Sequence, residues 1–470
     1  MGRLLGRFTL GRWLVAAAVL SGVCFMAPSA SGAPHVTPGP AGKIKHIVVI
    51  FQENRSFDEV LGQFCVDHAG RCDGYVGPVH LADGTTVPDI VSPDVISPDP
   101  PHNVSTQLKA IDHGRMDGWN NLPQCEVKGV NQCVSHYTEA QVPALSALAT
   151  YYVVADHTFS FEDSPSWGGH LAVAAATQDN FTGAIPTPVP GVPAGPGWGC
   201  NSNKVAPWIN PTTHQQLFEP SCIPAPVGML SPTKFPYNGP FKATPVQYVP
   251  TIFDRLDAVK QPWRIYASIV GWSICPSFAE CEYGPQHSNL VAPTQILTDA
   301  KSGKLPAYSV LSPTGPGGTG QHPPSSMLVG DNWIAKVVSA IASGPDWSST
   351  AIFITYDDCG CFYDHVAPPG LNPDGTQMGL REPMVIVSPY AKFGTTDSHD
   401  ATFASILRFA EETFGLPALS VNDAQAYDYS GAFDFTKAAT APRVKLTQKP
   451  VPESTIKKVA SLPPSDDQDT

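Results

Sequence analysis

Two continuous apolar runs, each followed at once by carboxylate or amide side chains, dominate the hydrophobic pattern of this chain. The runs occupy residues 47–51 and 351–354, and the polar side chains that follow them are Glu53, Asn54, Asp357 and Asp358. Runs rich in Ile and Val and bounded by polar residues predict buried parallel strands. Ligands of open α/β sheets bind beyond the carboxyl ends of the strands, so these side chains are expected to converge if both strands share one sheet.

The remaining pattern alternates between short apolar runs and helical periodicity, which indicates an α/β fold. Strands are expected at residues 44–51, 152–155, 263–269, 307–311, 351–356 and 383–388, and helices at 144–151, 164–177, 252–259, 331–343 and 402–414. Residues 75–105 are expected to form a long loop. Residues 183–239 are crowded with Pro and Gly, so we expect an irregular insertion or cap pinned by a disulfide.

The two ends of the chain differ in composition from the rest. Three arginines precede an apolar run at 13–26, and small residues follow at 29–33. This order is typical of a secretory signal peptide, with cleavage expected after Ala33, and the run is short for a membrane span. The prediction is therefore an exported catalytic domain at 34–437, with no membrane span after signal removal, and a loosely ordered tail at 438–470.

Charge and cysteine content narrow the possibilities further. The formal net charge is −13 with 15% charged residues, which gives no basic surface for a nucleic acid. Without Cys24 of the signal, ten cysteines remain, an even number that suggests disulfides in an exported chain. Sequential pairing would join Cys65 to Cys72, Cys125 to Cys133, Cys200 to Cys222, and Cys275 to Cys281. Cys359 and Cys361 have two possible roles: they form a strained disulfide across one residue, or their thiolates bind zinc.

Glu53, Asn54, Asp357 and Asp358 together supply oxygen ligands for one or more divalent metal ions. Ca, Mg, Mn, Zn and Fe are all compatible with such a set. Each acidic cluster alone has a simpler interpretation as a helix cap or a turn. The adjacent pair Asp357-Asp358 favours the metal, because two neighbouring like charges repel unless a cation lies between them.

Ser166 is the candidate nucleophile. It lies at the start of a predicted helix, where free backbone N–H groups favour anions, and a nearby cation would activate its hydroxyl. A plain N-cap serine is the alternative. His170 lies one turn later on the same helix face and is expected to line the site. Arg55 is a candidate phosphate contact, although a salt bridge to a neighbouring carboxylate is the commoner role.

Four loop histidines are candidates for contacting phosphate or protonating a leaving group. They are His102, His287, His322 and His365. Histidine supplies both functions near neutral pH. A surface or structural role is the default alternative for each of them.

An ordered series of motifs resembles the bacterial phosphoesterase family, which contains phospholipases C and acid phosphatases. The matching segments are Glu53–Asp58, Gly114–Trp119, Asp163–His170, Gln321–Pro324, Thr355–Asp358, Phe362–Val366, Arg381–Pro389 and Ser405–Phe409. The resemblance implies an alkaline-phosphatase-like core, which is a doubly wound, mostly parallel sheet sandwiched by helices. It also implies metal ligation by Glu53, Asn54, Asp357 and Asp358, a phosphorylated Ser166, and contacts to phosphate or leaving group from His102, His287, His322 and His365.

The sequence departs from this family in three places. Gly168-Gly169 stands where many relatives have Pro-Asn, and Asp357–Cys361 stands where many have Asp-Glu-His-Gly-Gly. Ser166 stands where phospholipase members often have Thr, which leans toward an acid phosphatase.

Two classes of function follow. The first is a secreted metal-dependent phosphoesterase acting on soluble monoesters or on phospholipids, and the second is a non-catalytic binding protein that keeps the fold. The aromatic residues of the insertion are open to two interpretations, as a lipid-facing lid or as loop packing. They are Trp198, Trp208, Phe235 and Tyr237.

Overall fold

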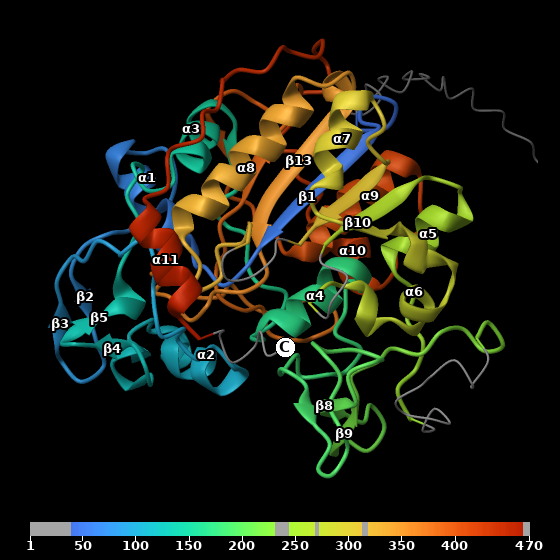
Figure 1. The fold of residues 1–470 in the computed structure, drawn as a ribbon, viewed down its shortest axis with the longest axis horizontal. Helices are drawn as coiled ribbons and strands as arrows, with labels where there is room; N and C mark the ends of the chain where they lie inside the picture. The colour runs from blue at the N-terminus through green and yellow to red at the C-terminus, as the bar shows by residue number, and fades with distance from the viewer. Residues whose placement is uncertain (1–38, 231–243, 268–271, 313–317, 464–470) are drawn as a thin grey trace, which may run out of the picture. The chain divides into compact units, whose positions relative to one another are not determined.

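The core of the protein is an eight-stranded, mostly parallel sheet (Figure 1). The computed structural model describes residues 39–230, 244–267, 272–312 and 318–463, so the predicted signal peptide lies outside the described residues. The strand order is β11-β10-β12-β1-β13-β14-β6-β15. The strands are β1 (His46–Gln52), β6 (Val153–Val154), β10 (Trp263–Tyr266), β11 (Leu290–Val291), β12 (Tyr308–Leu311), β13 (Thr350–Tyr356), β14 (Val385–Val387) and β15 (Thr395–Thr396).

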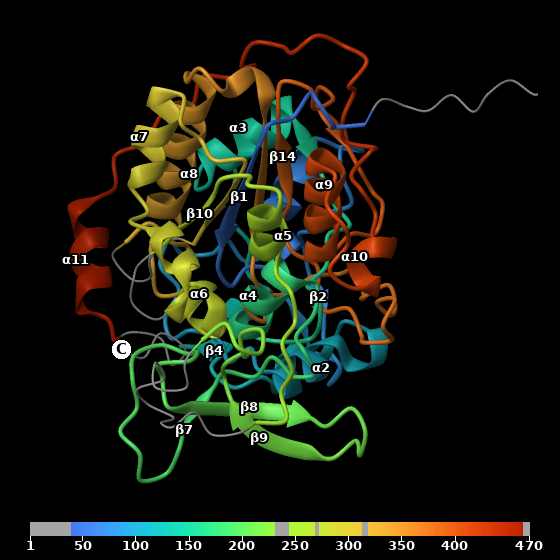
Figure 2. The same cartoon turned by 90° about the vertical axis from the view of Figure 1, so that its right-hand side faces the viewer.

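Helices cover both faces of this sheet (Figure 2). One face carries α3 (Pro143–Tyr151), α7 (Gln295–Ser302) and α8 (Met327–Ala342), and the other carries α5 (Ile252–Ala258), α9 (Phe403–Phe414) and α10 (Val421–Gln425). The predicted α/β class, with a mostly parallel sheet sandwiched by helices, is confirmed. Helix α9 shows why the elements form where they do: Thr402 and Ser405 close a capping box at its start, and its apolar residues recur every three or four positions.

Strands β1 and β13 are neighbours at the centre of the sheet and run in parallel. Their register pairs His46 with Thr350 and Gln52 with Tyr356, so both strands end at the same level. Residues 47–51 are fully buried because helices cover both faces of the sheet, which explains their continuous apolar character. The polar residues that follow the two strands therefore leave the sheet side by side, as expected.

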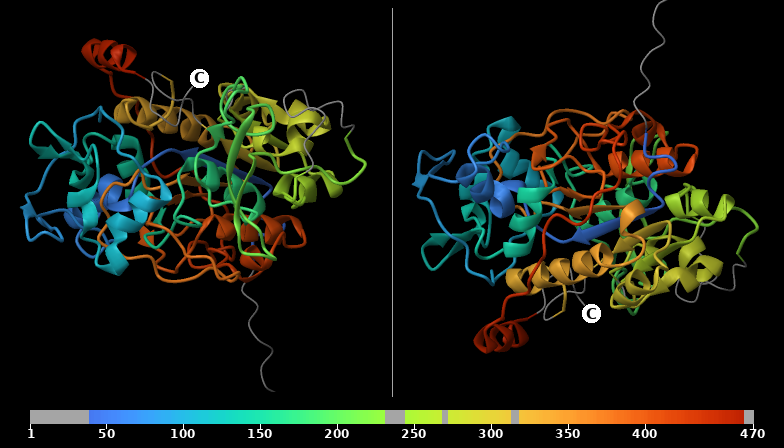
Figure 3. Two further views of the ribbon diagram at one scale, coloured as in Figure 1. Left: turned by 90° about the horizontal axis from the view of Figure 1, so that it is seen from below. Right: turned by 90° about the horizontal axis from the view of Figure 1, so that it is seen from above.

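Smaller elements surround this core. They are α1 (Gln63–Asp67), β2 (Val79–His80), β3 (Thr86–Val87), α2 (Val104–Ile111), β4 (Glu126–Val127), β5 (Val130–Asn131), β7 (Thr187–Pro188), β8 (Lys204–Ile209), β9 (Gln216–Pro220), α6 (Ala279–Tyr283) and α11 (Glu453–Ser461). The region expected to be irregular contains the antiparallel sheet β7-β8-β9, which lies beyond α4 (Ser166–Ala175) on the side toward which β1 points (Figures 1 and 2). Helix α11, within the predicted tail, lies on the outer side of α8 (Figure 3).

Four disulfides are present, as expected for an exported chain, and they follow the sequential pairing considered above. They join Cys65 to Cys72, Cys125 to Cys133, Cys200 to Cys222, and Cys275 to Cys281. Cys359 and Cys361 are buried free thiols, and the backbone N–H of Cys361 donates to the Cys359 sulfur at 3.1 Å. Among the described residues, no helix has the length and apolarity needed to cross a bilayer.

Candidate active site

Ser166 is the first residue of α4 and faces the ends of β1 and β13. Its Oγ lies 3.1 Å from Asp358 Oδ2 and 3.2 Å from Asn54 Oδ1. Pro165 occupies the N-cap position, so the serine hydroxyl does not cap the helix. A hydroxyl has one hydrogen and donates to one acceptor at a time, so a cation among these three oxygens would relieve the repulsion that remains between them.

Close backbone approaches hold these segments together. Asn54 has a left-handed backbone with φ 61°, and its N–H donates to Asp357 Oδ1 at 2.9 Å. A Cβ at Gly169 would lie 2.4 Å from the Asp357 carbonyl oxygen, so glycine lets α4 approach the strand end. A Cβ at Gly360 would likewise lie 2.4 Å from the Asn54 carbonyl oxygen. The departure from the family pattern at Gly169 thus falls where two backbones touch, and Gly360, which matches the pattern, lies at the other close approach.

His102 and His322 converge on Asn54 from two loops. The Asn54 amide nitrogen lies 3.2 Å from His102 Nε2 and 2.9 Å from His322 Nε2. Their Nδ1 atoms face the carbonyl oxygens of Pro100 and Pro323, which places hydrogen on Nδ1 and leaves Nε2 as the acceptor. Both imidazoles therefore present Nε2 toward the neighbourhood of Ser166.

Glu53, His170 and Asp357 form the other half of the site. His170 Nε2 lies 3.7 Å from Asp357 Oδ2 and 4.0 Å from Glu53 Oε1, and all three residues are buried. Neither ring nitrogen of His170, nor Asp357 Oδ2, has a hydrogen-bond partner. These ligand atoms lie close enough together to hold one metal ion. Glu53, Asn54, Ser166, His170, Asp357 and Asp358 are called the strand-end cluster below.

The electrostatics of the strand-end cluster favour a bound cation. Burial, with repulsion from Asp358 and Glu53, raises the pKa of Asp357 well above its usual range. Burial also lowers the pKa of His170 to about 3, so this histidine is neutral and brings no compensating charge. Buried carboxylates without a counter-ion are costly, and a divalent ion would neutralise them. The residues present therefore fit a metal.

Arg55 does not face the site, which corrects the expectation that it contacts phosphate. Its guanidinium donates to the Gln321 carbonyl oxygen at 2.8 and 3.1 Å and to Glu59 Oε1 at 2.9 Å. It is fully buried between the rings of Tyr137 and Phe362. The alternative interpretation, a salt bridge to a carboxylate, matches these contacts. Arg55 fixes the segment that carries His322.

His365 lies in a different cluster, contrary to the expectation that it contacts phosphate or leaving group. Its Nδ1 is 2.6 Å from Asp58 Oδ2, and its Nε2 is 3.2 Å from Asp73 Oδ1. Arg381 is buried beside it and pairs with Asp58 at 3.2 Å and Asp364 at 3.0 Å. These five residues are called the Asp58 cluster below, and Arg381 offsets part of the charge of its carboxylates.

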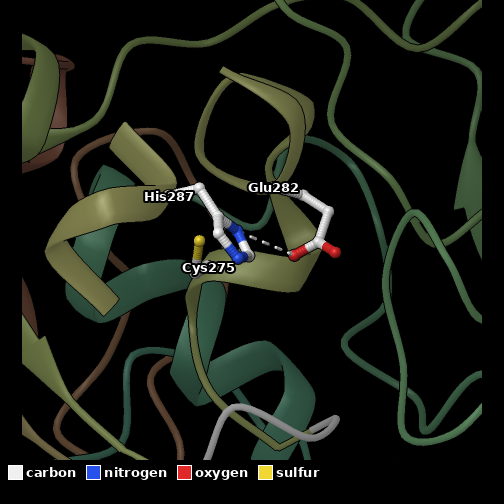
Figure 4. A group of neighbouring side chains, drawn as sticks. All are labelled: Cys275, Glu282 and His287. Atoms are coloured by element: carbon white, nitrogen blue, oxygen red, sulfur yellow. Dashed lines mark ion pairs between the residues drawn. The ribbon is translucent and has the colours of Figure 1, made fainter. Parts of the chain in front are cut away.

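His287 is also placed elsewhere (Figure 4). Its side chain is 52% exposed, and its Nδ1 lies 3.8 Å from Glu282 Oε2. The nearby Cys275 sulfur is bonded to Cys281, so it is no thiolate ligand. This group therefore makes a poor metal site, and the exposed loop position explains why His287 does not join the cluster.

Two carboxylates beside the site, the partly buried Asp99 and the buried Glu382, were not predicted. Asp99 Oδ2 lies 4.0 Å from His322 Nε2, and the segment Asp99–His102 carries both a carboxylate and a histidine. Glu382 accepts a hydrogen bond from Ser160, and burial raises its pKa well above the usual range. The sequence did contain one indication of its role, because Glu382 lies within the family-like motif Arg381–Pro383.

The aromatic residues of the insertion that lie within the described residues are packed inside. Trp198 and Trp208 are each 2% exposed, and Trp198 packs edge-on against His170 with ring centroids 5.0 Å apart. The lid interpretation is therefore wrong for these two residues. Phe235 and Tyr237 lie outside the described residues.

The profile of the Phosphoesterase family matches residues 44–417. This chain belongs to the phosphoesterase family. The match covers most of the chain, and it confirms the resemblance read from the ordered motifs. Family membership accounts for the shared segments from Glu53 to Phe409.

Similar curated proteins carry phospholipase names. Non-hemolytic phospholipase C of Pseudomonas aeruginosa is 24% identical, over 91% of this chain and 63% of its own length. Non-specific phospholipase C1 of Arabidopsis thaliana is 25% identical, over 77% of this chain and 63% of its own length. Phospholipase C A of Mycobacterium tuberculosis is 24% identical, over 87% of this chain and 81% of its own length. The chain thus spans less than two thirds of the length of the first two.

Solved structures show a weaker likeness. A protein in the alkaline phosphatase superfamily from Vibrio parahaemolyticus is 11% identical, with a TM-score of 0.36 over 83% of this chain and 71% of its own. A likeness of this degree adds nothing to the fold assignment, which rests on the sheet itself.

Proposed function

We propose that this protein is an exported, metal-dependent phosphoesterase that cleaves phosphate esters through a phosphoserine at Ser166. The observation that carries the proposal is the position of Ser166 Oγ, 3.1 Å from Asp358 Oδ2 and 3.2 Å from Asn54 Oδ1 at the ends of two neighbouring strands. Membership of the phosphoesterase family supports the reaction class. The signal-like residues 1–33 support export.

The metal would be held by oxygen atoms of the strand-end cluster. The proposed ligands are Glu53, Asn54, Ser166, Asp357 and Asp358. A divalent ion there supplies Lewis-acid activation of the serine oxygen and neutralises charge developing on the phosphoryl group. The unpartnered Asp357 Oδ2 supports this assignment.

The reaction proposed has two displacements on phosphorus. In the first, the bond between Ser166 Oγ and phosphorus forms, the ester P–O bond breaks, and the hydroxyl proton moves toward Asp358. In the second, water attacks phosphorus, the Oγ–P bond breaks, and Ser166 regains a proton. Each step passes through a highly charged transition state that the site stabilises.

His102 and His322 are proposed to donate hydrogen bonds to the phosphoryl oxygens and a proton to the leaving group. Both present Nε2 near Asn54, on the side of Ser166 that faces the two loops. A protonated Nε2 would donate to a phosphate oxygen or to the departing alkoxide.

For the substrate we propose a phosphodiester of the phospholipid class, because the similar curated proteins are named phospholipases C. The alternative is a soluble monoester, which the serine nucleophile favours. A non-catalytic binding protein is less well supported, because such a protein has no need to bring a serine hydroxyl between metal-ligating side chains.

The experiment compares p-nitrophenyl phosphate with p-nitrophenylphosphorylcholine as substrates, with and without a chelator and after metal is added back. We expect chelator-sensitive hydrolysis of the choline diester. Cleavage of the monoester alone would make the protein a phosphatase. No release from either substrate by metal-loaded protein would contradict the proposal and favour the binding protein.

A further inference from the structure

His170 has an unusual position for a buried histidine. Its side chain is 0% exposed, yet neither ring nitrogen has a hydrogen-bond partner. A neutral imidazole carries one donor and one acceptor, and burying both without partners is costly. Buried polar groups of this kind in native proteins usually have a function or an unseen partner.

The ring is held in place by aromatic packing. Phe51 lies 5.3 Å from it and Trp198 5.0 Å from it, measured between ring centroids. This packing directs Nε2 toward Asp357 Oδ2 and Glu53 Oε1, at 3.7 and 4.0 Å. Both separations are too long for hydrogen bonds. They are slightly wider than the roughly 3–3.5 Å between neighbouring ligand atoms around an ion with metal–ligand distances of about 2.0–2.2 Å.

We propose that His170 is a nitrogen ligand of the metal, beside Glu53 and Asp357, and that it makes the site selective for borderline transition ions. This inference rests on the proposed function only in placing a metal at the strand-end cluster. Imidazole nitrogen favours ions such as Zn²⁺, Fe²⁺ and Cu²⁺, whereas sites built from oxygen alone suit Ca²⁺, Mg²⁺ and Mn²⁺. The Asp357 Oδ2 atom that lacks a hydrogen bond provides the adjoining oxygen ligand.

The test measures metal binding directly and does not depend on activity. The full-length mature protein is stripped with a chelator, and Zn²⁺ and Ca²⁺ affinities are measured by competition with indicator dyes. Zinc-edge X-ray absorption then reports imidazole scattering around the bound ion. The variants are His170→Ala and His170→Gln, because glutamine keeps more volume beside Trp198 and replaces the nitrogen with an amide oxygen. His136→Ala is the control, since His136 is also buried but pairs with Asp89.

We expect the unmodified protein to prefer Zn²⁺ over Ca²⁺. Both His170 variants should lose at least about 10–100-fold in Zn²⁺ affinity, the loss typical of removing even an outer-shell partner. They should also lose imidazole scattering and keep their Ca²⁺ affinity, while His136→Ala should match the unmodified protein. Thermal melts would establish that at least the glutamine variant folds.

Two results would overturn the inference in distinguishable ways. If the folded glutamine variant keeps both the Zn²⁺ affinity and the imidazole signal, then His170 is no ligand, although the proposed metal site survives. If the unmodified protein binds neither ion, then the metal-dependent function proposed above fails together with this inference.

Discussion

The strand-end cluster and the Asp58 cluster use the same kinds of residue, and each contains a group of carboxylates and a histidine close enough to hold an ion. Both arise from the same two chain segments, because Asp58 follows Asn54 by four residues and His365 follows Asp358 by seven. They differ in their counter-ions. Arg381 and His365 cover both oxygens of Asp58, whereas Asp357 Oδ2 accepts no hydrogen bond. A cluster that supplies its own cation is structural, and one that lacks it is built for an external ion.

The largest effect is expected from Ser166→Ala. Loss of the nucleophile should reduce kcat by about 10³-fold or more, while the melting temperature stays close to that of the unmodified protein and the other ligands still hold the metal at saturating concentration. Ser164→Ala is the matched control, because Ser164 lies in the same segment and accepts a hydrogen bond from Gln178 instead. Steady-state kinetics and metal analysis check both variants. Activity near that of the unmodified protein in Ser166→Ala would remove Ser166 from the mechanism.

The next effect concerns the stability of the Asp58 cluster. Arg381→Met should lower the free energy of unfolding by about 3–5 kcal/mol, because it leaves buried carboxylates without a partner. Arg115→Met is the control: Arg115 pairs with Asp112 but is 57% exposed, so its loss should change stability by less than about 1 kcal/mol. Urea unfolding measures both. If the two substitutions change the stability equally, Arg381 does not stabilise the protein by neutralising the buried carboxylates.

Two matched aspartate substitutions should have opposite effects on the metal-free protein. Asp357→Asn should leave its stability unchanged or raise it by about 1 kcal/mol, because it removes a repelled carboxylate while an amide oxygen still accepts the Asn54 N–H. Asp364→Asn should destabilise by about 1–3 kcal/mol, because the buried Arg381 guanidinium loses a carboxyl acceptor.

Urea unfolding of chelator-treated protein, followed by metal titration, compares these variants. Asp357→Asn should lose the stabilisation that added metal gives, and Asp364→Asn should keep it. If Asp357→Asn destabilises the metal-free protein as much as Asp364→Asn does, the distinction between the two clusters is wrong.

The smallest effect is a pH dependence in the Asp58 cluster. Burial alone would lower the pKa of His365, but its hydrogen bond to Asp58 and the charges of Asp58 and Asp364 raise it above 6.5. A raised pKa means that the stabilising contribution is complete below the usual value and is lost as pH rises through the raised one. His365→Gln should therefore cost more stability at about pH 5.5 than at about pH 9.

Unfolding midpoints at the two pH values test this effect. His80→Gln is the control, since His80 is exposed and contacts the Thr86 hydroxyl rather than a carboxylate. A cost of His365→Gln that is independent of pH would show that the ring stabilises by packing alone.

The sequence predicted the parts of the site that depend on backbone pattern. The apolar runs before Glu53 and Asp357 located β1 and β13, and the Ser164–Pro165 signal located the start of α4. These features are local, so they can be read from a single segment. The four disulfides close short loops in sequential order, a pairing that the sequence suggested without fixing the connectivity.

Side-chain partners could not be predicted in the same way. Arg55, His287 and His365 were each predicted to contact phosphate or the leaving group. In the structure, their hydrogen-bond and ion-pair partners hold them away from Ser166. Arg55 meets Gln321, 266 residues away, and His365 meets Asp58, 307 residues away. Such pairings depend on the packed tertiary structure. The converse holds for His170, whose lack of a partner is visible only when every neighbouring side chain is placed.

The most direct test of the account is to trap the intermediate. Metal-loaded protein would be mixed with p-nitrophenylphosphorylcholine, quenched in acid on the millisecond scale, digested and analysed by mass spectrometry. The account predicts that the phosphorylcholine group left after nitrophenol departs is found esterified to Ser166, and that it is absent after chelation and in Ser166→Ala. Modification of a different residue, or turnover by Ser166→Ala with no trapped species, would contradict it.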